Sequence, residues 1–257
     1  MSIHPQAIID PTATIADDVT IGPFSVIGAE VDIGPGSWIG PHVVISGPTS
    51  IGRDNKIYQF ASIGDAPQDK KYDGEPTRLE IGDRNVIREY CTISRGTVQD
   101  TGVTRIGNDN WIMAYVHIAH DCQVGNNTIF ANSATLAGHV IVEDFAILGG
   151  FTLVHQFCKV GEHCFTAMNS VISKDVPPYI MVSGHMASPH GLNVEGLKRR
   201  GFSAEALNTL RKAYKILYRS GKTLEQAITE IGELSPDLDE IQRFKQFLQN
   251  VTRGIVR

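Results

Sequence analysis

The sequence has no long apolar stretch and no excess of positive charge. None of its hydrophobic runs approaches the ~18 residues that a membrane-spanning helix requires. The first ten residues, MSIHPQAIID, carry neither the basic nor the apolar segment of a secretion signal. A net charge of −5 and an isoelectric point near 6.0 argue against a nucleic-acid binder. These absences predict a cytoplasmic protein without a membrane span or a nucleic-acid partner.

Isoleucine, by contrast, recurs at a fixed interval of six residues. The phase is unbroken at Ile3, Ile9, Ile15, Ile21, Ile27, Ile33, Ile39, Ile45, Ile51, Ile57 and Ile63, and it resumes at Ile81, Ile87 and Ile93. It then slips by one residue and continues at Ile106, Ile112, Ile118, Val124, Phe130, Leu136, Val142, Leu148, Val154, Val160, Thr166 and Ile172. We number the places of each six-residue unit, or hexad, from this residue.

Place five of the hexad is usually small or β-branched, as at Ala13, Val19, Ser25, Val31, Ser37, Val43 and Ala61. A chain that buries places one and five must turn at places three and four. This period predicts an all-β solenoid of parallel strands, with three hexads in each coil and coils ~4.8 Å apart. The four cysteines, Cys91, Cys122, Cys158 and Cys164, all hold place five. They are expected to be buried packing residues, not disulfides or zinc ligands.

Two polar segments interrupt the repeat, and a third segment ends it. Residues 66–79 and 94–105 are rich in turn formers and predict loops that project from the solenoid. The paired prolines of DVPPYIMVSGH are expected to end the strands. Beyond them the spacing becomes helical, with Ser203 as an N-cap and a stop at Gly221, and two further helices follow in TLEQAITEIGEL and DLDEIQRFKQFLQNVTR. We therefore expect a β-helix domain over 1–189 and an α-helical domain over 190–257.

One stretch, VHIAHDCQVGNN, concentrates titratable side chains at a predicted corner of the solenoid. Because Ile118 begins a hexad, His120 and Asp121 hold places three and four, which should face solvent. Eighteen residues further on, the same places are held by Gly138 and His139, and then by Gln156 and Phe157. His117 ends the strand that enters this corner. The spacing predicts that these groups stack in one column along an edge.

Two chemistries could use such a column. His117, His120 and His139 could bind zinc, as in a β-helical carbonic-anhydrase-like hydratase. Alternatively, His120 could act as a general base that Asp121 orients, with the Gly138 amide as an oxyanion donor. The unperturbed imidazole pKa of ~6.5 suits proton removal near neutrality. A third reading is a solenoid scaffold without catalysis, although the clustered histidines, the loops and the appended helices argue against it.

Longer motifs favour the second chemistry. IGPFSVIGAEVDIGPGSWIG resembles the hexapeptide-repeat acyltransferases, whose coils form a left-handed β-helix. HIAHDCQVG, ATLAGHV, VHQF, QDKKYDGEPTRLEIGDRN and NVEGLKRRGF together resemble the UDP-N-acetylglucosamine O-acyltransferases, the first enzymes of lipid A synthesis. The resemblance covers the whole chain. A related family that acts on already acylated glucosamine usually carries an extra N-terminal domain, whereas the repeat here begins by residue 3.

This resemblance implies both an activity and a set of residues. An acyl carrier protein would deliver an (R)-3-hydroxyacyl thioester to the 3-hydroxyl of UDP-N-acetylglucosamine in a homotrimer, without a metal or another cofactor. His120 would be the base, Asp121 its orienter and Gly138 the oxyanion donor. The matching substrate-binding positions are Gln68, Asp69, Lys71, His117, His139, Gln156, Asn193, Glu195, Arg199 and Arg200. Here the run Lys198–Arg200 offers phosphate donors and a basic patch for an acidic carrier.

The resemblance also suggests the length of the acyl chain. Met168 holds place three of the hexad that begins at Thr166, on a different edge from His120. Members that take long chains have glycine at the matching position. A methionine there would close the far end of the acyl groove across a subunit boundary, so we expect a chain of about ten carbons.

Overall fold

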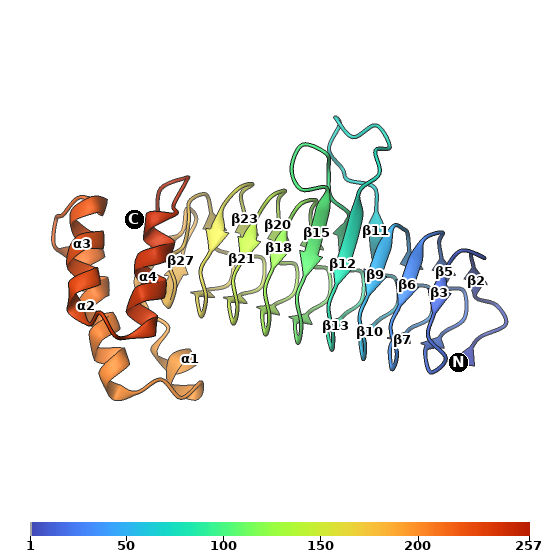
Figure 1. The fold of residues 1–257 in the computed structure, drawn as a ribbon, viewed down its shortest axis with the longest axis horizontal. Coiled ribbons are helices and arrows are strands. Elements are labelled where there is room, and N and C mark those ends of the chain that lie inside the picture. The colour runs from blue at the N-terminus through green and yellow to red at the C-terminus, as the bar shows by residue number, and fades with distance from the viewer. Residues whose placement is uncertain (1) are drawn as a thin grey trace.

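The computed structural model describes residues 2–257 and shows a long three-sided solenoid with helices packed at its C-terminal end (Figure 1). Sheet A contains β1 (Ser2–Ile3), β4 (Thr20–Ile21), β7 (Trp38–Ile39), β10 (Lys56–Ile57), β13 (Val86–Ile87), β16 (Trp111–Ile112), β19 (Ile129–Phe130), β22 (Ile147–Leu148), β25 (Phe165–Thr166), β27 (Ile180–Ser183) and β28 (Ser188–Leu192). Sheet B contains β2 (Ile8–Ile9), β5 (Val26–Ile27), β8 (Val44–Ile45), β11 (Ser62–Asp65), β14 (Thr92–Ser94), β17 (His117–Ile118), β20 (Thr135–Leu136), β23 (Leu153–Val154) and β26 (Val171–Ile172). Sheet C contains β3 (Thr14–Ile15), β6 (Val31–Ile33), β9 (Thr49–Ile51), β12 (Arg78–Ile81), β15 (Val103–Ile106), β18 (Gln123–Val124), β21 (Ile141–Val142) and β24 (Lys159–Val160).

The hexad explains this architecture directly. Place-one side chains such as Ile39, Ile57 and Ile87 are fully buried, and they stack in register along sheet A. Place four carries a positive φ at nearly every corner, because the chain must turn sharply between two sheets. The three-hexad coil predicted from the period is therefore confirmed. The four cysteines are buried and free, also as expected.

Both predicted loops project from the same edge of the solenoid, the one between sheets B and C (Figure 1). They are shorter than the sequence suggested and cover only residues 66–77 and 95–102. The predicted start at residue 66 is correct. The other ends were wrong because the flanking residues pair: Ser94 pairs with Asp65, and β12 and β15 align Arg78–Ile81 with Val103–Ile106. This ladder fixes the feet of the two loops beside each other.

The outer faces of the three sheets differ in character. Place-six side chains point outward, and on sheet A they include Trp38, Val86, Trp111, Ile129, Ile147 and Phe165. Sheet B presents Ile8, Val26, Val44, Leu153 and Val171, together with the polar Ser62, Thr92, His117 and Thr135. Sheet C presents Thr14, Asp32, Ser50, Glu80, Arg105, Gln123 and Lys159, with Ile141 as the apolar exception. Most of the outward apolar side chains therefore lie on sheets A and B, and sheet C is mostly polar.

The strands continue past the paired prolines, which corrects the sequence prediction. Pro177 and Pro178 lie in the turn before β27, where no ladder hydrogen bond needs their missing N–H. β27 then pairs with β25, and β28 pairs antiparallel with β27. β28 crosses the predicted domain boundary between residues 189 and 190. The division of the chain into two domains there stays a prediction.

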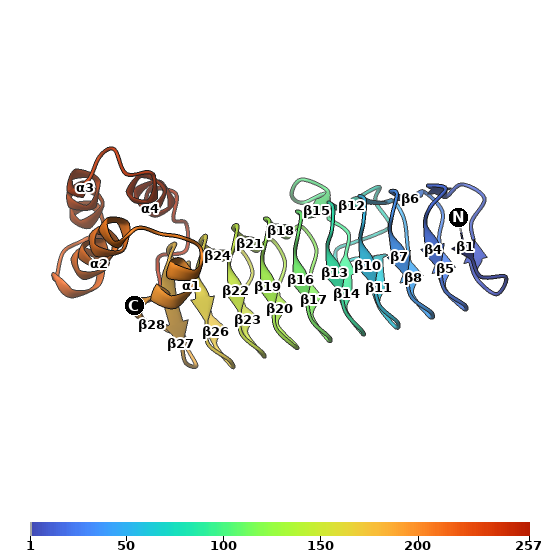
Figure 2. The same cartoon turned by 90° about the horizontal axis from the view of Figure 1, so that it is seen from below.

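Helices close the C-terminal end (Figure 2). They are α1 (Val194–Arg199), α2 (Ala204–Arg219), α3 (Leu224–Leu234) and α4 (Asp239–Gln249). Ser203 caps α2 as predicted, and Thr223 and Gln226 form a capping box on α3. The predicted third helix ends at Gln249 rather than Arg253, and α1 was not predicted as a helix. No helix within residues 2–257 has the length and apolarity to cross a membrane.

Candidate active site

The column of corner residues forms as the spacing predicts. Ile118, Leu136 and Val154 are consecutive partners in sheet B, so the corners that follow β17, β20 and β23 lie above one another. Asp121, His139 and Phe157 occupy place four with φ values of 60°, 62° and 66°. The sharp turn directs these side chains to the edge between sheets B and C.

This corner is not open to solvent, contrary to the sequence prediction. The side chain of Asp121 is completely buried because the loop over residues 95–102 folds across it. The Thr97 N–H lies 2.9 and 3.1 Å from the two Asp121 carboxylate oxygens, and the Thr97 hydroxyl donates to Oδ2 over 2.6 Å. Hexad spacing could not reveal this cover, because the loop has no period.

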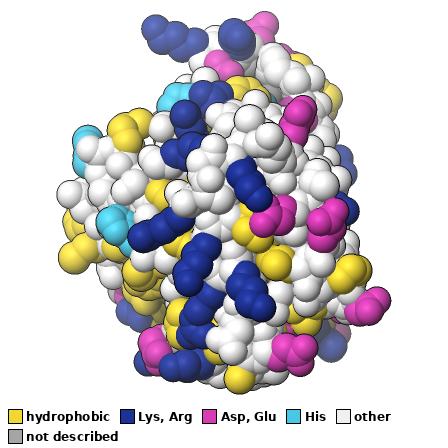
Figure 3. Space-filling view, turned by 90° about the vertical axis from the view of Figure 1, so that its left-hand side faces the viewer, with side chains coloured by type: hydrophobic (Ala, Val, Ile, Leu, Met, Phe, Trp, Pro, Cys, Tyr) yellow, Lys and Arg dark blue, Asp and Glu magenta, His cyan; other side chains and the backbone are white. Residues whose placement is uncertain are grey.

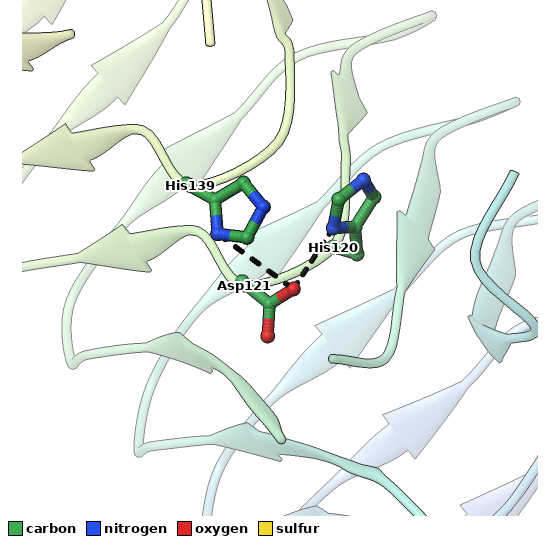
Figure 4. A group of neighbouring side chains, drawn as sticks. All are labelled: His120, Asp121 and His139. Carbon is green, nitrogen blue, oxygen red and sulfur yellow. Dashed lines mark hydrogen bonds and ion pairs between the residues drawn. The ribbon is translucent and has the colours of Figure 1, made fainter. Parts of the chain in front are cut away.

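His120 and Asp121 form a close pair (Figure 4), with 2.9 Å between His120 Nδ1 and Asp121 Oδ2. Burial pushes the pKa of Asp121 upward, but the hydrogen bonds from His120 and Thr97 outweigh it and hold that pKa below its usual value. An ionised carboxylate can only accept, so in the neutral imidazole Nδ1 carries the proton and Nε2 keeps a free lone pair. His120 therefore has the tautomer that a general base needs.

Because Gly138 has no side chain, the His120 imidazole has room to lie against it. A Cβ on Gly138 would lie 2.5 Å from His120 Cε1 and 2.7 Å from Nε2, so any side chain there would displace the ring. Within residues 2–257 no group accepts the Gly138 N–H. Place-three N–H groups are dispensable for the coil, since Pro11, Pro23 and Pro41 hold the same place elsewhere. The Gly138 N–H beside the base is thus available to an oxyanion.

His139 belongs to the same cluster. Its ring stacks on Phe157 with 4.4 Å between the centroids and stands perpendicular to the His120 ring at 5.0 Å. His139 Nδ1 lies 2.9 Å from Asp100 Oδ2 and 3.9 Å from Asp121 Oδ2. Two imidazoles and two carboxylates therefore share one corner.

A cavity of about 770 Å³ opens beside these groups. The corner residues His120, Gly138, His139 and Gln156 line it, and the first loop contributes Gln68, Asp69 and Lys71. Their contact with a substrate stays a prediction. The second loop adds Gln99 and Asp100, which the sequence interpretation missed. The interruption of the repeat marked their loop, but no spacing rule places individual loop residues. A larger cavity of about 940 Å³ lies over sheet C and contains none of the histidines.

The remaining predicted residues lie outside this cavity. His117 is half-buried on the outer face of sheet B, where its Nδ1 lies 2.7 Å from Thr92 Oγ1. Its pKa is lowered mainly by burial and also by the nearby His120. Met168 is 75% exposed on the edge between sheets A and B. Within one chain, neither lines the cavity around His120.

The residues at α1 lie on the third edge, between sheets C and A. Asn193 caps α1 and donates to the His163 carbonyl, and Arg200 donates to the Phe145 carbonyl over 2.9 Å. The Arg200 guanidinium also covers the Phe145 ring at 4.8 Å. These bonds occupy part of the donor set that the sequence assigned to a phosphate. Glu195 and Arg199 are exposed on the same short helix.

The geometry also bears on a metal. The groups whose ligand atoms converge within 4.8 Å are His120, Asp121 and His139, and not the three histidines of the hydratase hypothesis. His117 is engaged with Thr92 instead. The oxygens of Asp121 already accept hydrogen bonds from Thr97 and His120. This arrangement fits an oriented base better than a three-histidine zinc site.

Comparison with known proteins agrees with the geometry. A family model described as "Udp N-acetylglucosamine O-acyltransferase; Domain 2" matches residues 175–256, and one described as "Bacterial transferase hexapeptide (six repeats)" matches residues 104–138. The acyl-[acyl-carrier-protein]–UDP-N-acetylglucosamine O-acyltransferase of Thiobacillus denitrificans is 63% identical over 100% of this chain and 99% of that protein. The chain belongs to this acyltransferase family.

Other members agree over the full length. The protein of the same name from Janthinobacterium sp. is 58% identical over 99% of both chains. Among solved structures, LpxA from Acinetobacter baumannii is 49% identical over 99% of both chains, with a TM-score of 0.97. The UDP-N-acetylglucosamine acyltransferase of Francisella novicida is 44% identical over 99% of this chain and 94% of that one, with a TM-score of 0.98. The resemblance and the left-handed β-helix with a C-terminal helical region are thereby confirmed.

Proposed function

We propose that this acyltransferase acts in the cytoplasm and moves an (R)-3-hydroxyacyl group from an acyl carrier protein to the 3-hydroxyl of UDP-N-acetylglucosamine, the first step of lipid A biosynthesis. The single observation that carries the proposal is the His120–Asp121 pair beside the open Gly138 N–H, at the wall of the cavity. Relatives that match over the full chain are named for the same carrier and the same sugar nucleotide.

The chemistry follows from the three groups. His120 Nε2 takes the proton of the sugar 3-hydroxyl as its oxygen attacks the thioester carbonyl. Negative charge then develops on the carbonyl oxygen, where the Gly138 N–H can donate to it. The tetrahedral intermediate collapses, the carbon–sulfur bond breaks, and the imidazolium returns its proton to the leaving thiolate. Asp121 stabilises the imidazolium throughout, because its buried carboxylate is held 2.9 Å from Nδ1.

The polar residues around the cavity would position the sugar nucleotide. Gln68, Asp69 and Lys71 reach it from the first loop, and His139 and Gln156 reach it from the corner column. The chemistry suits a polyhydroxylated substrate, since amide, carboxylate and imidazole groups can all exchange hydrogen bonds with hydroxyls. His117 would contribute from the adjoining face of sheet B.

A homotrimer would bring the remaining residues to the same place. The outer faces of sheets A and B carry exposed Trp111 and Leu153, both 45% exposed, whereas the face of sheet C is polar. Packing face A of one subunit on face B of the next covers both apolar faces and closes a ring of three. The edge with His120 then meets the neighbour's edge with Asn193, Glu195, Arg199 and Arg200. The nucleotide would bind between them.

The same packing explains the proposed role of Met168. In a ring built from faces A and B, the edge between these two faces lies at the threefold axis. An acyl chain that enters at the His120 edge and runs inward between the apolar faces would end at this edge. Met168 would stop it there, which favours a chain of about ten carbons.

The carrier protein would dock at the C-terminal end of the solenoid. Lys and Arg side chains form a stripe across this end of the molecule (Figure 3). On α2 the exposed residues Arg211, Lys212, Lys215 and Arg219 follow the three- and four-residue spacing of one helix face. Three coils separate the His120 corner from the last strand of sheet B, a distance of about 14 Å along the axis. An acidic carrier bound here needs a prosthetic arm that spans at least this distance.

The zinc hydratase remains a separable alternative. It requires a metal held by His117, His120 and His139, whereas the ligand atoms that converge among residues 2–257 are those of His120, Asp121 and His139. Metal analysis of protein purified without chelators is expected to find no stoichiometric zinc. One zinc per chain, with activity lost on its removal, would favour the hydratase.

The proposed function is tested with purified protein, UDP-N-acetylglucosamine and a series of 3-hydroxyacyl carrier-protein thioesters, with products identified by mass. We expect a monoacylated sugar nucleotide and the highest kcat/KM near ten carbons. No product from any thioester would refute the function, and an optimum near fourteen carbons would refute only the role of Met168. Sedimentation of the same sample should give three times the 28.1 kDa mass of the chain.

A further inference from the structure

Two histidines line the cavity, and each pairs with a different carboxylate. His120 Nδ1 lies 2.9 Å from Asp121 Oδ2, and His139 Nδ1 lies 2.9 Å from Asp100 Oδ2. His139 Nδ1 is also only 3.9 Å from Asp121 Oδ2. A small rotation of His139 would therefore let both rings share one carboxylate.

Asp121 has little capacity for a second imidazole. Its Oδ2 accepts from His120 and from both the N–H and the hydroxyl of Thr97, and its Oδ1 accepts from the same N–H. Each carboxylate oxygen offers about two lone-pair sites. Oδ2, the oxygen nearest His139, already accepts from three donors, so a bond from His139 to Oδ2 would have to replace one of them.

The second loop is built so that Asp100 reaches His139. Thr97 anchors the loop to Asp121, and the Thr97 carbonyl accepts from the Gly102 N–H over 3.1 Å to close the turn. A Cβ on Gly96 would lie 2.4 Å from the Gly102 carbonyl carbon, so glycine permits the two ends of the loop to meet. Asp100 itself lies at the exposed tip, with 43% of its side chain accessible.

Stacking fixes the plane of the His139 ring, but not its tautomer. Phe157 lies against one face at an interplanar angle of 9°. The position of the ring proton is then decided by whichever group faces Nδ1. Asp100, an acceptor, favours the proton on Nδ1 and leaves the lone pair on Nε2.

We propose that Asp100 is a positioning residue that works through His139. Asp100 holds His139 as the Nδ1–H tautomer, so that Nε2 can accept a hydrogen bond from a hydroxyl of the bound sugar. It also keeps His139 from competing with His120 for Asp121. The expected effect on turnover rests on the proposed function. The tautomer itself does not, and it can be measured without substrate.

A double-mutant cycle tests this assignment. Asp100→Ala should lower kcat/KM about tenfold, because the charged partner of His139 is lost. Asp100→Asn retains an oxygen that accepts from Nδ1 and should stay within about threefold of wild type. In a His139→Phe background, which keeps the stack on Phe157, Asp100→Ala should change kcat/KM less than about twofold. Thermal midpoints should be unchanged, because Asp100 lies at an exposed loop tip.

Two outcomes would overturn the proposal. Asp100→Ala could cost the same factor with phenylalanine at 139, which would show that it does not act through His139. Alternatively, Asp100→Asn could lose as much as the alanine variant. Nitrogen-15 NMR of the imidazoles supplies an independent reading: wild type should show His139 protonated at Nδ1, and Asp100→Ala should show mixed tautomers. Wild type without any turnover would refute the proposed function, and the NMR result would still decide the role of Asp100.

Discussion

The edge between sheets C and A and the edge between sheets B and C are built from the same hexad. They differ in whether the backbone N–H at place three has a hydrogen-bond acceptor. On the C–A edge, a chain of side-chain oxygens accepts hydrogen bonds from backbone N–H groups over 2.7–2.9 Å. The bonds run from the Arg53 N–H to Asp83, from the Asp83 N–H to Asn108, from the Asn108 N–H to Asn126 and from the Asn126 N–H to Asp144. Each place-three side chain thus caps the place-three N–H of the coil before it. On the B–C edge, the Gly138 N–H has no acceptor within residues 2–257.

This difference separates a stabilising edge from a reactive one. A capped N–H contributes to the stability of the stack, whereas an open N–H can bind a substrate oxygen. The A–B edge shows that openness alone is not enough. Its place-three residues Ala114 and Asn132 also have N–H groups without an acceptor within residues 2–257. Its place-four residues, however, form a continuous stack of rings made by Phe24, His42, Phe60, Tyr90 and Tyr115. Among the residues that the structure describes, only the B–C edge combines an open N–H with a His–Asp pair.

The largest expected effect is at the reactive edge. His120→Ala removes the base and should lower kcat by about 10²–10⁴-fold, while the thermal midpoint stays near that of wild type. Initial rates with a 3-hydroxyacyl carrier thioester measure the first quantity, and thermal unfolding measures the second. A variant that retains more than about a third of the wild-type rate would remove His120 from the mechanism.

The matching change on the capped edge should do the reverse. Asn126→Ala leaves the Asn108 N–H without its acceptor and should destabilise the fold by about 1–3 kcal/mol. Denaturant unfolding measures this loss, and kcat of the folded variant should be unchanged. If Asn126→Ala lowered kcat as strongly as stability, the two edges would not divide their roles as described.

The third edge offers a change in selectivity. Met168→Gly should raise kcat/KM for fourteen-carbon donors relative to ten-carbon donors by at least about tenfold, since a steric stop is removed. Each added methylene is worth about 0.8 kcal/mol of burial once the groove is open. Competition between two donors in one tube gives the ratio directly. The same length profile before and after the change would exclude Met168 as the stop.

The smallest expected effect concerns the basic face of α2. Lys212→Glu with Lys215→Glu should raise the KM for the carrier a few-fold and weaken its dependence on salt, because exposed charges are screened within ~10 Å at 0.1 M. Arg53→Gln, on the C–A edge, is the matched control and should leave both unchanged. The KM for UDP-N-acetylglucosamine should not move in either variant. Equal effects from both changes would argue against docking at α2.

The acid stability of the fold should also depend on Asp121. Its pKa is held below the usual value of 3.8 in the folded protein, so its ionised form stabilises the fold above that pH. This contribution disappears as the pH falls through the lowered pKa. The difference in thermal midpoint between wild type and Asp121→Asn should therefore be largest near neutrality and shrink below pH ~4. A constant difference across this range would contradict the pairing.

The sequence predicts what is periodic in this molecule. Ile118, Leu136 and Val154 define the coil, and counting from them places His120 next to Gly138 without any coordinates. Thr97 and Asp100 lie in an interruption, where no period relates one residue to the next. Their contacts with Asp121 and His139 depend on a folded loop whose feet pair through β12 and β15. For this reason the spacing predicted the correct corner but wrongly predicted that this corner faces solvent.

Hexad spacing also cannot predict which residues act together across a subunit boundary. Met168 and Arg200 lie on two edges that never meet the His120 edge within one chain. Family resemblance suggested their roles, and the apolar faces of sheets A and B give a physical reason for the assembly that would unite them. Counting hexads identifies the edge of each residue, but it cannot show which faces pack together.

The most direct test is a crystal structure of the protein with its acylated UDP-N-acetylglucosamine product bound. We expect the ester oxygen on C3 to lie within about 3.2 Å of His120 Nε2. The ester carbonyl oxygen should lie within about 3.2 Å of the Gly138 N–H. The acyl chain should run toward Met168 of a neighbouring subunit. Product bound over sheet C, or with its ester far from both groups, would contradict the assignment of the open edge as the site of acyl transfer.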